Sequence, residues 1–199
     1  GCLDRRPQEF GPLHVRCEIG SALDAVLYTA RFMHYAAGIQ LFGLAAFQAV
    51  LAPAGLRQAL DKPFRRLAWV SAAFFLLGGL LWLAAQAGSM GEGWSDGLNP
   101  QVIAIVLSET AFGHAWRWHL GFCVVALLAL VRRRTRGWLP LLLLSTLALG
   151  SLGLVGHAAI DTGLMSILNR SSQILHLLSS GFWVGSLAPL LYCLVEINR

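Results

Sequence analysis

Charged residues are scarce in this sequence. Asp, Glu, Lys and Arg make up only 13% of the 199 residues, whereas hydrophobic residues make up 56% and the mean hydropathy is +0.63. A soluble domain carries about 25% charged residues, which cover its surface. The scarcity of charge therefore excludes an ordinary water-soluble domain and indicates a membrane protein.

Catalytic motifs are also missing. The sequence contains no Gly-rich phosphate loop, no nucleophile with an evident base and no paired carboxylates placed for acid–base catalysis. We therefore expect a protein that is not an enzyme. The formal net charge of +5 is explained by membrane topology, described below, and predicts no nucleic-acid partner.

Long apolar runs are what the sequence does contain. A helix needs about 20 mostly apolar residues to cross a bilayer, and no run shows the two-residue alternation of barrel strands. The predicted fold class is therefore all-α, a polytopic transmembrane helix bundle in the lipid bilayer. Five spans are predicted, at about 28–52, 67–87, 111–131, 138–160 and 171–195. Residues 1–26 are expected to form an irregular periplasmic tail, and residues 27–199 a single transmembrane domain.

Basic residues in the short loops predict the orientation, because cytoplasmic loops carry an excess of Lys and Arg. The segment 88–110 between the second and third spans has no Lys or Arg. Two other loops are basic, with Arg57, Lys62, Arg65 and Arg66 in one and Arg132, Arg133, Arg134 and Arg136 in the other. The N-terminus is thus expected outside and the C-terminus inside.

Histidines gather on one side of this topology. Five of the six are expected within about 10 Å of the outer end of their helices, at 1.5 Å per residue. Neutral imidazoles from several helices suit copper, zinc or haem iron. His114 and His119 lie about 140° apart around their helix, so both cannot face one small ion. The candidate metal ligands are His34, His114, His119, His157 and His176.

Four segments together carry a family resemblance. They are "RFMHYAAGIQLFG", "TAFGHAWRWHLGF", "GHA" at 156–158 and "LHLLSSGFWVGSLAPL". In order and spacing they resemble the copper resistance protein D family of bacterial inner-membrane proteins. The resemblance covers about residues 31–191, and His34, His157 and His176 match its recurrent histidines. His114 and His119 match its variable third-helix opening. The family has about eight helices, so we expect this chain to be its N-terminal five-helix portion, truncated at the C-terminus.

The resemblance implies a multi-pass inner-membrane protein that binds copper ions and takes them into the cytoplasm, contributing to copper resistance. It also implies a periplasmic copper-binding partner of the C type. Against a Met-rich Cu(I) relay, the sequence has only three Met and no CxxC pair among its four Cys. A b-type haem protein is the alternative, with His34 and His176, or His157 and His176, as axial ligands. A structural subunit with interfacial histidines is a third interpretation.

Overall fold

The structure, a computed structural model, describes residues 12–131, 137–155 and 163–197. Throughout these residues the elements are helices, and none of them is a strand. Four of the described helices are long and apolar enough to cross a membrane, namely Ala22–Leu51, Ala54–Met90, Ala111–Val131 and Gly163–Val195. The prediction of an all-α transmembrane bundle is confirmed.

The first helix begins earlier than predicted. Helix α1 spans Pro12–Ala46 and continues as a π-helical turn, η1, over Phe47–Leu51. The expectation that residues 1–26 are irregular is therefore wrong for residues 12–26, which belong to this helix. Helix α1 starts 22 residues before His34, so His34 does not lie near the N-terminal end of its helix, where the predicted span placed it.

Helix α2 spans Ala54–Met90 and is much longer than the predicted 67–87. Its first four turns contain the basic residues that we assigned to a loop, so the charged segment is helical. The segment 88–110, also expected as a loop, contains two short helices, α3 (Trp94–Gly97) and α4 (Pro100–Glu109). The Asn99 side chain caps α4 by accepting a hydrogen bond from Gln101 N at 3.0 Å.

Of the three later helices, one has the predicted bounds and two differ from them. Helix α5 spans Ala111–Val131, as predicted. Helix α6 spans Leu139–Ser151 and ends in a 3-10 turn, η2, over Leu152–Leu154, whereas residues 156–160 of the predicted span lie outside the described residues. Helix α7 spans Gly163–Ile197 and begins eight residues before the predicted 171.

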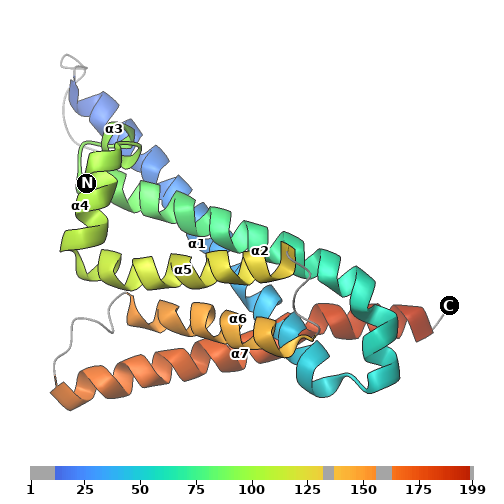
Figure 1. Ribbon diagram of the computed structural model, residues 1–199. Helices are drawn as coiled ribbons and strands as arrows, with labels where there is room; N and C mark the ends of the chain where they lie inside the picture. Colours follow the sequence, from blue (N-terminus) through green and yellow to red (C-terminus); the bar gives the residue numbers. More distant parts are fainter. Residues whose placement is uncertain (1–11, 132–136, 156–162, 198–199) are drawn as a thin grey trace.

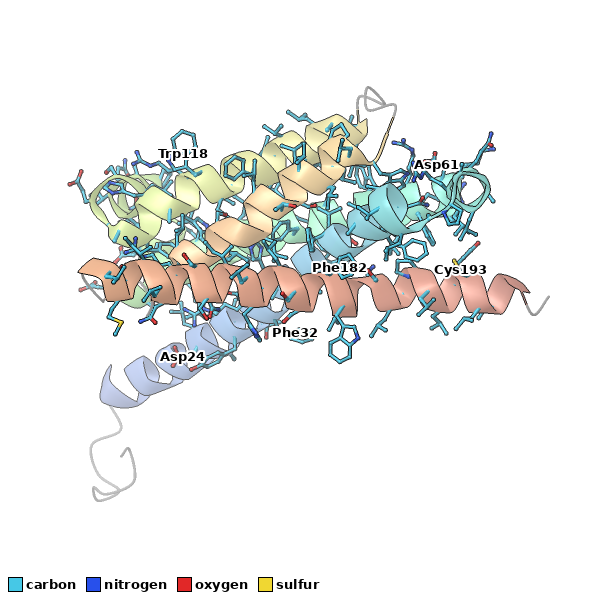
Figure 2. The ribbon with its side chains drawn as sticks, turned by 90° about the horizontal axis from the view of Figure 1, so that it is seen from below. Asp24, Phe32, Asp61, Trp118, Phe182 and Cys193 are labelled. Atoms are coloured by element: carbon cyan, nitrogen blue, oxygen red, sulfur yellow. The ribbon has the colours of Figure 1, made fainter. Side chains whose placement is uncertain are left out.

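Helix α1 forms the centre of the packing. It contacts α2, α6 and α7, while α5 packs against α2 and α6. Helices α3 and α4 lie at one end of the bundle, and the turn between η1 and α2 lies at the other, near the end of α7 (Figure 1). The outer faces of the long helices carry exposed apolar side chains such as Trp118, which points away from the bundle (Figure 2). Such a surface suits contact with lipid.

Glycines bring α1 and α7 together. A Cβ atom added to Gly43 would overlap the backbone of Gly185, and it would lie 2.7 Å from the carbonyl O of Gly181. The Gly181–Gly185 pair has the small-xxx-small spacing that lets membrane helices approach closely. The two backbones are therefore in direct contact, and no larger side chain fits between them.

Candidate functional site

Two of the five predicted histidines meet in the centre of the bundle. His34 of α1 and His119 of α5 are both 0% exposed, and their ring centroids are 4.9 Å apart. Both side chains come from membrane-spanning helices, where a buried polar group needs a partner or a function. This imidazole pair is the candidate site.

Small residues on α2 make room for the pair. A Cβ atom on Gly78 would lie 3.1 Å from backbone atoms of His34, and one on Gly79 would lie 3.1 Å from His34 Cε1. The Gly79 position would also place a Cβ 3.2 Å from Leu120 Cδ2. Any larger residue at these two positions would press on α1 or on the His34 imidazole.

A backbone carbonyl sets the tautomer of His34. Its Nδ1 lies 2.7 Å from the carbonyl O of Phe75. A carbonyl only accepts, so neutral His34 carries its proton on Nδ1 and a lone pair on Nε2. That Nε2 is buried and has no hydrogen-bond partner among the described residues. An unused nitrogen lone pair therefore lies in the middle of the membrane domain.

His119 is held in the same way by the end of α6. Its Nδ1 lies 3.0 Å from Ala148 O and 2.8 Å from Ser151 Oγ. The Ser151 hydroxyl donates to Ala148 O at 2.7 Å, so it is free to accept the Nδ1 proton. At the tighter turn that follows, the Leu152 N–H bonds to Leu149 O, which leaves Ala148 O open to His119.

The other nitrogen of His119 faces a thiol. Cys123 Sγ lies 3.5 Å from His119 Nε2, one helical turn along α5. Because Nδ1 is the donor to α6, Nε2 has the lone pair and accepts from the thiol. Cys123 is 1% exposed, so the thiol shares the buried environment of the imidazole pair.

Aromatic rings surround the two imidazoles. Phe75 lies against His34, with centroids 4.4 Å apart, and Trp116 stacks on His119 at 4.8 Å. Trp82 meets the edge of His34 at 5.8 Å. The Arg31 guanidinium lies over the Trp82 ring, 5.0 Å from its centroid, and donates to Gln86 Oε1 at 3.2 Å. The imidazole pair is thus surrounded by aromatic rings, and one of these rings, Trp82, also contacts a cation.

The remaining predicted ligands lie apart from the pair or outside the described residues. His114 is exposed, and its Nε2 contacts Ser108 O at 2.6 Å. This confirms that His114 and His119 point different ways. His176 is exposed on α7, and His157 lies outside the described residues. Within the described ranges, no three His, Cys, Asp or Glu side chains lie close enough together to hold a metal ion.

Sequence reasoning missed several residues of this site. Cys123 follows His119 by four residues, a spacing that places both on one helix face, and this signal was available. Trp116 is three residues before His119 and shares that face, although an interfacial anchor explains a Trp equally well. The roles of Ser151 and Gly79 depend on helix packing, which no local pattern encodes.

Comparisons with known proteins agree on one relationship. A family model described as copper resistance protein D-like, N-terminal domain, matches residues 22–167. Inner membrane protein YebZ of Escherichia coli (strain K12) is 35% identical over 169 residues, which cover 84% of this chain and 58% of that protein. Copper resistance protein D of Pseudomonas syringae pv. tomato is 32% identical over 169 residues, covering 82% and 54%.

This chain therefore spans a little over half the length of these two curated relatives. No solved structure matches it. Together with the four long apolar helices, the relatives identify a multi-pass inner-membrane protein.

Proposed function

We propose that this chain, which belongs to the copper resistance protein D-like family, handles copper ions at the buried pair of His34 and His119. One of its relatives is named for copper resistance. The histidines present neutral nitrogen donors, which suit copper. We include copper uptake across the inner membrane in the same proposal. The curated relatives are longer than this chain, so uptake by this chain is proposed from the family and not taken from them.

The anchoring of both rings is the observation that carries the proposal. Metal-ligating histidines almost always donate their second ring N–H to a carbonyl, carboxylate or water, which orients the ring and leaves the first nitrogen for the metal. His34 does this with Phe75 O and His119 with Ala148 O. Both Nε2 lone pairs are therefore oriented as those of metal ligands are.

The direction of transport in this proposal runs from outside to inside. Basic residues 57–66 lie around the turn between η1 and α2, at the end of the bundle opposite α3 and α4 (Figure 1). The positive-inside rule then puts that turn in the cytoplasm and α3 and α4 outside. His114, His157 and His176 would receive copper at the outer side, from a periplasmic copper-binding protein of the C type, and pass it to the buried pair.

A non-enzymatic role is part of the same proposal. The Ser151 hydroxyl lies 2.8 Å from His119 Nδ1. Its proton goes to Ala148 O, so it accepts from the ring instead of being activated by it. A catalytic serine needs the opposite arrangement, in which the imidazole takes the hydroxyl proton.

Haem b is less well supported than copper. His176, a member of both expected axial pairs, is exposed, whereas His34 is fully buried. The two imidazoles that do meet lie with centroids 4.9 Å apart among packed aromatic rings. Axial ligands on opposite faces of a haem would have the porphyrin plane between them, and this contact leaves no space for one.

The test is a copper titration of the detergent-purified full chain, with its metal content and visible spectrum recorded before and after Cu(I) is added. We expect stoichiometric copper, no haem band, and at least about tenfold weaker binding in His34→Ala and His119→Ala. Ser145→Ala, at a buried serine of α6 whose hydroxyl donates to Leu142 O, is the control for the buried pair. A haem band, or copper binding that neither buried substitution weakens, would overturn the proposal.

A further inference from the structure

The thiol beside the imidazole pair is the unexplained group of the site. Cys123 Sγ lies 3.5 Å from His119 Nε2, and His34 Nε2 is a buried nitrogen with no hydrogen-bond partner in the described part of the chain. Two donor atoms of α5 therefore lie next to each other, and the ring that carries the third lies beside His119, although the three side chains as they stand do not form a metal site. Both rings are anchored to backbone carbonyls through Nδ1, so the contact of the thiol with His119 Nε2 is additional to that anchoring.

The spacing of nitrogen and sulfur fits two ligands of one metal ion. With a metal–nitrogen bond of about 2.0 Å and a metal–sulfur bond of about 2.3 Å, a separation of 3.5 Å corresponds to an angle of about 110°. Such an angle is close to that of tetrahedral coordination. His34, with its ring centroid 4.9 Å from that of His119, would complete the set by a movement of its ring within the aromatic cage.

The residues around the site determine whether a monovalent or a divalent cation is favoured there. Phe75, Trp82 and Trp116 line it, and no carboxylate is hydrogen-bonded or ion-paired to its imidazoles among the described residues. A monovalent cation that replaces the thiol proton leaves the site uncharged. A divalent cation would leave a net positive charge in an apolar interior, which is costly. Arg31, stacked on Trp82, raises that cost further.

We infer that Cys123 is a third ligand of this site, as a thiolate beside His34 and His119, and that the site takes a monovalent soft cation, Cu(I). The inference rests on the proposed copper function and specifies the oxidation state of its ion. Thiolate is a soft ligand that favours Cu(I), whereas carboxylates and water do not. In the binding step the S–H bond breaks, a Cu–S bond forms and one proton leaves to the buffer, with no change of oxidation state.

The experiment measures two quantities in the full chain, with Cys2→Ser, Cys17→Ser and Cys193→Ser as background. The first is Cu(I) affinity, with Ag(I) as a redox-inert monovalent probe. The second is the number of protons released per ion, from calorimetric titrations in two buffers. Cys123→Ser is compared with this background, and restoring Cys193, also a buried membrane cysteine, provides the matched control.

We expect one proton released per Cu(I) in the background protein and none in Cys123→Ser, with affinity at least about tenfold lower. If Cys123→Ser binds and releases protons as the background does, while His34→Ala and His119→Ala lose binding, Cys123 is not a ligand and the proposed function stands. If none of the three substitutions changes binding, both fail.

Copper X-ray absorption of the background protein tests the sulfur ligand directly, without the Cys123→Ser variant, which must itself fold to be informative. It should show a sulfur neighbour at about 2.3 Å, and a coordination shell of nitrogen alone would overturn the inference.

Discussion

The indole of Trp116 lies nearly flat against the imidazole of His119, with ring centroids 4.8 Å apart and an interplanar angle of 28°. The same indole donates from Nε1 to the carbonyl O of Gly79 on α2, at 3.3 Å. Gly79 lies four residues after Phe75, whose carbonyl holds His34. Trp116 therefore links His119 to the segment of α2 whose carbonyl holds His34.

Substitution of Trp116 should weaken both the fold and the site. Trp116→Ala leaves a cavity where a fully buried indole packed, which we expect to cost about 3 kcal/mol or more. Trp116→Phe keeps a ring against His119 and loses the hydrogen bond, so its cost should be about 1 kcal/mol. Thermal unfolding in detergent measures both. Trp118→Ala is the control, because Trp118 is 72% exposed on the same helix, and an equal effect there would contradict the expectation.

Ser151 should affect metal binding more than folding. Its hydroxyl accepts from His119 Nδ1 at 2.8 Å, and loss of such a partner typically lowers metal affinity 10- to 100-fold. Ser151→Ala keeps the Ala148 carbonyl as an acceptor, so we expect about a tenfold loss in Cu(I) affinity. Ser145→Ala is the matched change, since Ser145 is a buried α6 serine whose hydroxyl donates to Leu142 O. Equal copper affinities in the two variants would argue against the anchoring role.

Gly43 should tolerate no side chain. A Cβ atom there would overlap the backbone of α7 at Gly185, and backbone atoms cannot move aside as a flexible side chain can. We expect Gly43→Ala to lower the free energy of unfolding by about 1–3 kcal/mol. Gly121→Ala, where nothing lies within 4 Å of the new Cβ, should be neutral or slightly stabilising. Similar unfolding midpoints would show that the close contact contributes little.

Acid should release copper. Imidazole coordinates only when neutral, and a thiol ligand loses its proton on binding, so protons compete with the ion. The bound state is favoured at higher pH and lost as the pH falls. With one exchanged proton, Cu(I) affinity should fall about tenfold per pH unit near neutrality. Competition titrations between about pH 6 and pH 8 test this, and Cys123→Ser should flatten the slope. A flat slope in the unsubstituted protein would contradict it.

Hydropathy predicts the helices of this protein better than their ends. The span 111–131 was predicted with its observed bounds, and Thr110 caps α5 there by accepting from Gly113 N. The start of α1 at Pro12 was missed because its first turns are polar and helical outside the apolar run. A window of apolar residues reports burial in lipid, and a helix can continue beyond it.

The site was half predictable. His34 and His119 were both candidates, but they were not paired with each other, because the pairing depends on how α1 and α5 each pack against α2. That packing is set by close contacts such as Gly79 against His34 and Gly79 against Leu120. Each contact joins residues far apart in the chain, and a local pattern carries no information about its partner.

The two imidazoles are attached to different helix pairs. His34 belongs to α1 and is held by Phe75 of α2, whereas His119 belongs to α5 and is held by Ala148 and Ser151 of α6. A sliding movement of about 1–2 Å between packed helices is a common conformational change. Any such movement of one pair against the other changes the separation of the two nitrogens directly. The spacing of the ligands is thus coupled mechanically to the relative position of the two halves of the bundle.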